Sequence, residues 1–341
     1  MTHTLNLVPN QQITPERYIS AINSYQLTEA IKSAIELEIF TAVSESNTTS
    51  ATIAKRCHCS ERGVRILCDF LTIHGFLTKQ ENTYSLTPDS ALFLDRHSPT
   101  YFGSAIEFLL TPRLRECHAH LTEAVRRGGT ALGEGMLDPE NPDWVKYAHG
   151  MMPMVRRPAE FIAAELRKGG QVHKVLDIAA SHGMFGIAVA QQNPAAHIYA
   201  LDWKNVLEVA QKNASAMGVG DRYHLIPGSA FEIDFGNGYD LALITNLLHG
   251  FDTSTCTKLM RKVHDALNPG GRVAIAEYVP NPDRVSPSIA AAFSLTMLAA
   301  TPSGDAYTLA DLEAMSKAAG FMRVELSPIE LGRNRLVIVY R

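Results

Sequence analysis

The stretch KVLDIAASHGMFG, Lys174 to Gly186, decides the fold of this chain. An apolar run ends around Asp177, a turn of small residues follows, and a segment of helical character begins at Met184. A strand, a tight turn and a helix in this order form the first unit of a nucleotide-binding α/β sheet, and small turn residues let a ligand approach the backbone. Further along, Asp202 ends a second apolar run, where an acid suits the two hydroxyls of a ribose. The pattern therefore predicts a site for an adenosine-containing cofactor.

The composition is that of an ordinary globular protein. The 341 residues suffice for two domains, with 46% hydrophobic and 19% charged residues. A formal net charge of −4 gives no support to bulk binding of nucleic acid or an anionic membrane. We find no signal-peptide pattern at the N-terminus and no apolar stretch that suits a bilayer. The five cysteines, an odd and mostly scattered set, favour reduced thiols and a cytoplasmic location.

The N-terminal part has the pattern of a winged helix-turn-helix. Apolar residues at near-helical spacing predict one helix from about Thr14 to Val43. The pattern continues with helices at Ala51–Arg56 and Glu61–His74 and a hairpin of Leu77–Lys79 with Tyr84–Thr87. Five cations against four anions between residues 50 and 90 make a poor phosphate footprint, so we expect packing against a partner chain rather than DNA binding.

The spacing of histidines and cysteines predicts no metal site. Cys57-His58-Cys59 lacks the usual separation of paired zinc ligands, and no second pair follows. His118 and His120 fall on different helix faces, although either one could line a substrate pocket. The surrounding segment, 100–167, reads as several helices with breaks at Pro112, Gly128-Gly129, 133–142, Pro153 and Pro158, and a helix is expected to start near Pro158.

From Val172 onward, strands and helices alternate, which predicts a doubly wound parallel sheet. The expected strands are Lys174–Ile178, His197–Leu201, Tyr223–Pro227, Leu241–Thr245 and Arg272–Ala276. The expected helices are Met184–Gln192, Val206–Ala216, Thr255–Ala266 and Leu309–Ala319. The last two runs, Phe321–Leu326 and Arg335–Tyr340, are too close in sequence for a helical crossover, so they should pair antiparallel.

With these motifs in order, nearly the whole chain resembles the S-adenosylmethionine-dependent O-methyltransferases that act on small molecules. The resemblance implies a winged-helix dimerisation domain at 1–100, a helical connector at 101–168 that contributes to the acceptor pocket, and a methyltransferase domain at 169–341. It also implies a class I methyltransferase fold, with a mainly parallel seven-stranded sheet and one antiparallel strand. A homodimer paired through the N-terminal domain is expected, with S-adenosyl-L-methionine as the cofactor and no metal.

The cofactor residues follow from the same resemblance. In the first motif Asp177 leads, Ala179 and Ser181 stand where glycines are usual, and Gly183 is kept; the loop lacks the G-x-G-x-x-G spacing of a dinucleotide site. Asp202 matches the ribose acid, and Trp203 offers a flat face to adenine, with core packing as the alternative. The remaining cofactor positions are Ser229, where an Asp is usual, Ala230 and Phe231 beside adenine, Thr245, where Lys is common, and Phe251, where Trp is usual.

His249 matches the family's catalytic histidine, and Glu277 matches the acid that orients it. Two positions depart from the family pattern, because Gly250 replaces a common Asp and Ala306 replaces a second acid. Residues matching the acceptor pocket, for which helical core packing is the alternative interpretation, are His118, Met151, Met152, Phe293 and Met297.

Three functions stay open from the sequence. The first is O-methylation of a small hydroxylated molecule, with His249 as general base. The second is methyl transfer to sulfur, nitrogen or carbon on the same fold, where a thioether acceptor needs no base. The third is a winged-helix regulator that senses the cofactor without catalysis.

Overall fold

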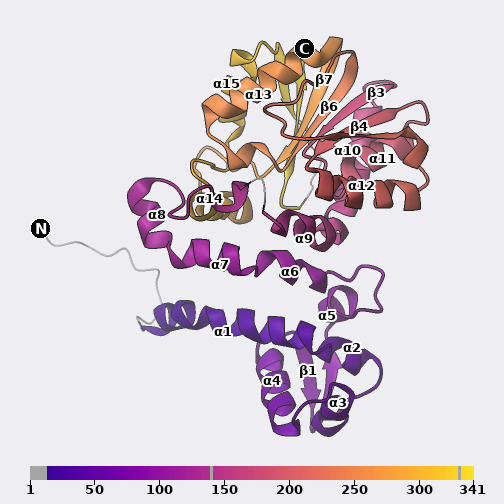
Figure 1. The fold of residues 1–341 in the computed structure, drawn as a ribbon. Helices are drawn as coiled ribbons and strands as arrows, with labels where there is room; N and C mark the ends of the chain where they lie inside the picture. Colours follow the sequence, from indigo (N-terminus) through magenta and orange to yellow (C-terminus); the bar gives the residue numbers. More distant parts are fainter. Residues whose placement is uncertain (1–13, 139–140, 329–331) are drawn as a thin grey trace, which may run out of the picture. The chain divides into compact units, whose positions relative to one another are not determined.

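The computed structural model describes residues 14–138, 141–328 and 332–341, which fall into two compact units, 1–103 and 104–341. The first unit contains α1 (Glu16–Glu36), α2 (Ile39–Ser44), α3 (Ser50–Arg56), α4 (Glu61–Ile73), β1 (Leu77–Gln80), β2 (Thr83–Leu86) and α5 (Pro88–Phe93), as Figure 1 shows. Strands β1 and β2 form an antiparallel hairpin beside α4. The predicted helix–helix–hairpin order is therefore confirmed.

The single helix predicted from Thr14 to Val43 is wrong. The chain breaks at Leu37–Glu38, where Glu38 adopts a left-handed conformation with φ of 56°. The break turns α2 so that Ile39 and Phe40 are buried, and the Glu38 carboxylate pairs with Arg56 at 3.1 Å. Apolar spacing alone misses this break because the residues on both sides of it are helical.

The second unit is built around a seven-stranded sheet. Its strands are β3 (Lys174–Ile178), β4 (His197–Asp202), β5 (Tyr223–Pro227), β6 (Tyr239–Thr245), β7 (Leu267–Glu277), β8 (Arg323–Leu326) and β9 (Arg335–Tyr340). The order across the sheet is β5-β4-β3-β6-β7-β9-β8, and only β9 runs antiparallel to its neighbours. The predicted strands and the reversed last pairing are confirmed.

The helices of this unit precede, connect and follow the strands. They are α6 (Ile106–Leu109), α7 (Pro112–Ala119), α8 (Leu121–Arg127), α9 (Asp143–Gly150), α10 (Met152–Arg167), α11 (Met184–Gln192), α12 (Lys204–Ala216), α13 (Thr253–Ala266), α14 (Ser288–Ala300) and α15 (Leu309–Ala318). Short 3₁₀ turns lie at Gly103–Ala105, Gly135–Leu137, Gly220–Arg222 and Leu248–Gly250.

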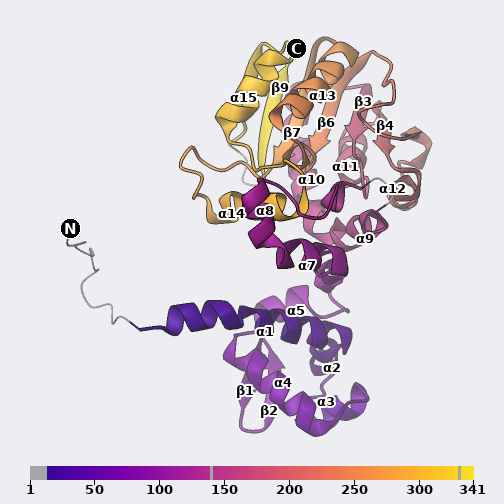
Figure 2. The ribbon, with the colours of Figure 1, turned by 60° about the vertical axis from the view of Figure 1, so that its left-hand side comes forward.

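Helices cover both faces of the sheet, with α10, α11 and α12 on one side and α13 and α15 on the other (Figure 2). Alternate residues of each strand enter two separate cores. Val175 of β3 packs toward α10 and α11, whereas Leu176 packs toward α13 and α15. Because successive residues of a strand are buried on opposite faces of the sheet, the strands appear in the sequence as continuous apolar runs.

The helix expected to start near Pro158 begins earlier, at Met152, and Pro158 lies inside it. Pro153 falls in the first turn of α10, where backbone N–H groups make no intrahelical hydrogen bond. The N–H that proline lacks is therefore not needed there. Beyond it, Val155, Ala159 and Ile162 form one buried face against the core, and this packing outweighs the cost of the internal proline.

Two further observations concern the whole chain. All five cysteines lie within the described residues, and none of them forms a disulfide. Within the described ranges, no helix combines the length and the apolar character that crossing a bilayer requires.

Candidate active site

A cavity of about 1030 Å³ opens in the second unit at the edge where the parallel strands end. Strands β4 and β6 lie on opposite sides of β3, so the sheet order reverses there, and ligands bind α/β sheets at such points. The predicted site residues that line this cavity are Ala179, Asp202, Trp203, Ser229, Ala230, Phe231, Thr245, His249, Phe251, His118, Met151, Phe293 and Met297.

The loop after β3 forms one wall of the cavity through small residues in unusual conformations. Ala179 and Ser181 both have left-handed backbones, with φ of 55° and 52°. Gly183 has φ of 77°, and a Cβ there would meet the Tyr223 hydroxyl at 2.7 Å. The loop therefore keeps a glycine-type backbone although only Gly183 of the three is glycine.

Asp177 and Gly183 do not line the cavity, which differs from the prediction that they contact the cofactor. The Asp177 side chain is fully buried behind the loop, where Oδ2 accepts a hydrogen bond from the Gly186 N–H at 3.1 Å. Its Oδ1 atom has no hydrogen-bond partner among the described residues, and burial raises the pKa of this carboxyl to about 8. Asp177 therefore joins the end of β3 to the first turn of α11.

Asp202 ends β4 and reaches the cavity wall. Its Oδ2 accepts the Ser181 N–H at 2.8 Å and its Oδ1 accepts the Trp203 N–H at 2.7 Å. Burial raises the pKa of Asp202 to about 6, partly offset by these two bonds. Each oxygen retains acceptor capacity, so the carboxylate can still receive the two hydroxyls of a ribose.

The adenine end of the predicted cofactor site is built by loops after β5 and β6. The Phe231 and Phe251 rings meet edge to face, with centroids 4.7 Å apart. Ser229 Oγ accepts the Phe231 N–H at 3.2 Å, which shapes the turn. Lys262 of α13 donates to the carbonyls of Ala230 and Ile233, so a helix on the far side of the loop holds it in place. No motif in the sequence marks Lys262 for this role.

His249 and Glu277 lie together at the ends of adjacent parallel strands. Glu277 Oε2 is 2.6 Å from Nδ1 of His249, and Oε1 accepts the N–H groups of Leu247 and Leu248, each at 2.8 Å. The His249 side chain is 16% exposed and lines the cavity, whereas that of Glu277 is 4% exposed and lies behind it. The carboxylate thus accepts Nδ1–H and leaves Nε2 as the ring nitrogen available to the cavity.

The rest of the cavity wall is apolar and aromatic. Phe293 of α14 meets the His249 ring edge to face at 4.9 Å and stacks on Tyr278 at 3.9 Å. Met152 does not line the cavity as predicted, because it packs against the core beside α11, and Met154 faces the cavity from the same helix.

Several lining residues were missed by sequence reasoning. His182 stacks on Tyr147 with ring planes 16° apart, and its Nδ1 accepts the Met184 N–H at 3.2 Å. Burial lowers the pKa of His182 to about 4, so the ring is neutral near pH 7. Because His182 lies inside the KVLDIAASHGMFG stretch, its position in the sequence could have identified it as a residue of the site. Arg333, in the turn that precedes the last strand, had no such signal.

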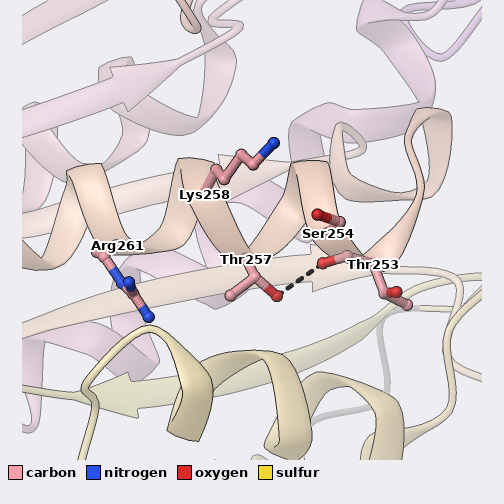
Figure 3. A pocket seen from close by; sticks show the side chains of 5 residues that line it. All are labelled: Thr253, Ser254, Thr257, Lys258 and Arg261. Atoms are coloured by element: carbon pink, nitrogen blue, oxygen red, sulfur yellow. Dashed lines mark hydrogen bonds between the residues drawn. The ribbon is translucent and has the colours of Figure 1, made fainter.

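A second, smaller hollow of about 270 Å³ lies on the outer surface of α13 (Figure 3). Lys258 and Arg261 extend to opposite sides of the helix there, and Thr257 Oγ1 donates to the Thr253 carbonyl at 2.6 Å. Because the side chains that line this hollow do not converge on one point, we place the chemistry in the larger cavity.

Comparison with known proteins agrees with this geometry. Residues 159–322 match the sequence model of the O-methyltransferase domain, and residues 19–96 match that of the O-methyltransferase dimerisation domain. A crystal structure of a protein assigned as an O-methyltransferase from Nostoc punctiforme is 50% identical, with a TM-score of 0.94, over 97% of this chain and 100% of that one. The chain belongs to the O-methyltransferase family.

Two more distant proteins are similar to this O-methyltransferase, one in sequence and one in fold. The 3-hydroxy-5-methyl-1-naphthoate 3-O-methyltransferase of Streptomyces sahachiroi is 26% identical over 302 residues, which are 87% of this chain and 86% of the relative. Human N-acetylserotonin methyltransferase, solved in complex with S-adenosylmethionine, shares the fold with a TM-score of 0.84 at 18% identity, over 98% and 99% of the two chains.

This O-methyltransferase is therefore an S-adenosylmethionine-dependent enzyme that acts on small molecules. The cavity fits an adenosyl cofactor on its own evidence. Asp202 presents a half-buried carboxylate with free acceptor capacity, and small residues of the β3 loop line the adjoining wall.

Proposed function

We propose that this O-methyltransferase methylates a hydroxyl group of a small hydrophobic acceptor, with His249 as general base and Glu277 as the residue that orients it. The observation that carries the proposal is the 2.6 Å contact between Glu277 Oε2 and Nδ1 of a histidine that lines the cavity. A thioether acceptor has no proton to remove, so methylation of a thioether would not require the His249–Glu277 pair.

The proton steps follow from the bonding of Glu277. Its three hydrogen bonds fix the carboxylate, so the His249 ring is held with the proton on Nδ1 and the lone pair on Nε2. When the acceptor hydroxyl attacks, its proton passes to Nε2, and Glu277 stabilises the resulting imidazolium. S-adenosylmethionine supplies a methyl group that is already activated on its sulfonium sulfur.

The chain's other contribution is alignment. We propose that the Asp202 carboxylate holds the ribose hydroxyls, and that Trp203, Phe231 and Phe251 enclose the adenine ring. Residues of the β3 loop would hold the methionine part. Alignment of two reactants in a closed site accounts for about 7–11 kcal/mol of a barrier in favourable cases.

The acceptor half of the cavity favours a flat apolar molecule. Phe293, Met151 and Met297 line it, together with Phe108 and Trp144, whose rings lie 6.3 Å apart. Thioether and aromatic side chains pack well against conjugated rings. We therefore propose a hydroxylated aromatic compound as the acceptor.

We also propose that the chain works as a homodimer joined through its N-terminal unit. Residues 19–96 match a dimerisation domain, and α1 exposes large apolar side chains at helical spacing, among them Tyr18, Ile22 and Tyr25. The layout we propose has the dimerisation domain at 1–100, the helical connector at 101–168 and the methyltransferase domain at 169–341.

The experiment that tests the function is product analysis with methyl-labelled S-adenosylmethionine. Naphthols and hydroxyquinones are offered beside the matching thiols, amines and methoxy compounds. We expect the label on oxygen, with no product from the methoxy compounds. Transfer to sulfur, nitrogen or carbon in preference to oxygen would contradict the proposal.

A further inference from the structure

Arg333 lies at the acceptor side of the cavity because of the reversed strand. Strand β9 is antiparallel to β7, so the residues that begin β9 lie at the edge where β6 and β7 end. Arg335 is in register with Glu277, and Asn334 Nδ2 donates to Asn246 Oδ1 at 2.6 Å. The side chain of Arg333 lines the cavity just beyond these contacts. Asp202, which ends β4, is separated from β9 by the three strands β3, β6 and β7.

Arg333 carries a positive charge that no described carboxylate balances. Among the described residues that line the cavity, it is the one lysine or arginine. The residue is exposed, its charge lies close to the side chain of Tyr278, and in the parts of the chain that the structure describes it forms no ion pair. Burial raises the pKa of Tyr278, and the Arg333 charge partly offsets that rise.

Tyr278 connects this charge to the reacting position. Its ring stacks on Phe293 with centroids 3.9 Å apart, and Phe293 contacts His249. The centroids of His249 and Tyr278 are 6.4 Å apart. An acceptor whose hydroxyl meets His249 and whose ring extends past Tyr278 therefore approaches the guanidinium of Arg333.

We infer that Arg333 forms an anion subsite, and that the acceptor is a hydroxylated aromatic compound bearing a carboxylate. The inference rests on the proposed function, since it assumes that the acceptor occupies the half of the cavity beside His249. The planar guanidinium matches a carboxylate in two-point geometry, and the apolar walls select the ring. The nearness of Arg333 to Tyr278 places this charge at the cavity wall.

The test is calorimetry on the full chain saturated with S-adenosylhomocysteine, so binding is measured without transfer. The probes are paired one- and two-ring compounds, hydroxynaphthoates with naphthols and hydroxybenzoates with phenols. We expect the carboxylate to tighten binding about tenfold in at least one pair. Arg333→Gln should reduce that preference to less than about threefold, and Arg333→Lys should keep part of it because the charge remains.

Arg323→Gln is the matched control, because Arg323 is an exposed arginine of β8 that pairs with Glu325. It should leave the carboxylate preference unchanged. The inference is overturned if no pair shows a preference for the carboxylate in the wild-type protein, or if Arg333→Gln retains that preference. Failure of the proposed function gives a different result, namely carboxylate-dependent binding without methyl transfer to the bound hydroxyl.

Discussion

The Nδ1 atom of His249 lies 2.6 Å from Oε2 of Glu277, and the other oxygen of that carboxylate holds two backbone N–H groups of the turn that carries the histidine. One side chain thus sets both the position and the tautomer of the ring. Neither effect depends on the Asp that is common in the family at the position of Gly250, or on the second acid expected in some members at the position of Ala306.

Glu277→Gln should lower kcat about 10²- to 10⁴-fold. The amide oxygen of Gln can still accept the N–H groups of Leu247 and Leu248, so the turn is preserved. Its amide N–H₂ then faces Nδ1, which forces the proton of His249 onto Nε2 and removes the base. Steady-state kinetics measures the loss, and calorimetry should show unchanged cofactor affinity; a variant with wild-type kcat would refute the tautomer role.

Replacing Ala179 or Ser181 with Gly should stabilise the ligand-free protein by about 1 kcal/mol each. Both residues hold left-handed backbones, which cost a residue with a Cβ more than glycine. Ser181→Gly also removes a buried hydroxyl that has no hydrogen-bond partner in the described parts. Denaturant unfolding provides the measurement. The control is Ala180→Gly, which lacks a positive φ and should destabilise; stabilisation of all three alike would rule out backbone strain as the cause.

Cofactor affinity should depend on pH through Asp202. Burial raises the pKa of this carboxyl to about 6, and only the ionised form accepts both ribose hydroxyls. Affinity should therefore be full above about pH 7 and fall roughly tenfold by pH 5. Asp202→Asn should bind the cofactor more weakly at every pH and lack this dependence. Calorimetry across the range tests both, and a wild-type affinity that rises toward pH 5 would contradict the assignment.

Ile22→Glu should separate the homodimer into monomers without unfolding either unit. Ile22 is 59% exposed on α1, so its replacement disturbs no core, while a charge in an apolar interface is costly. Light scattering gives the mass, and circular dichroism reports the fold. Lys32→Glu is the matched control, because this residue pairs with Glu36 on the same helix. An unchanged dimer in Ile22→Glu would exclude this face of α1 from the interface.

Much of the methyltransferase domain could be predicted because its strands are buried on both faces. Apolar segments such as Val175–Ile178 and Leu241–Thr245 are stable chiefly as strands that are buried on both faces of a sheet. An acidic residue or a turn of small residues indicates where each strand ends. The histidine and its acid could be placed for the same reason, since the ends of adjacent parallel strands share one edge.

What failed depends on contacts that no local pattern contains. The helix is interrupted at Glu38 because the turn there buries Ile39 and Phe40 in the core and lets the Glu38 carboxylate pair with Arg56. Pro158 remains inside α10 because the buried face of that helix outweighs a lost hydrogen bond. Met152 and Met154 are alike in sequence, and only the rotation of α10 decides which one faces the cavity. The charge of Arg333 reaches the cavity through the topology of β9 alone.

The most direct test is the single-turnover rate of methyl transfer to a hydroxylated aromatic acceptor by wild-type protein and by His249→Ala, with cofactor and acceptor saturating. We predict a loss of about 10²- to 10⁴-fold, with cofactor affinity unchanged. A His249→Ala protein that transfers the methyl group at the wild-type rate would contradict base catalysis by this histidine.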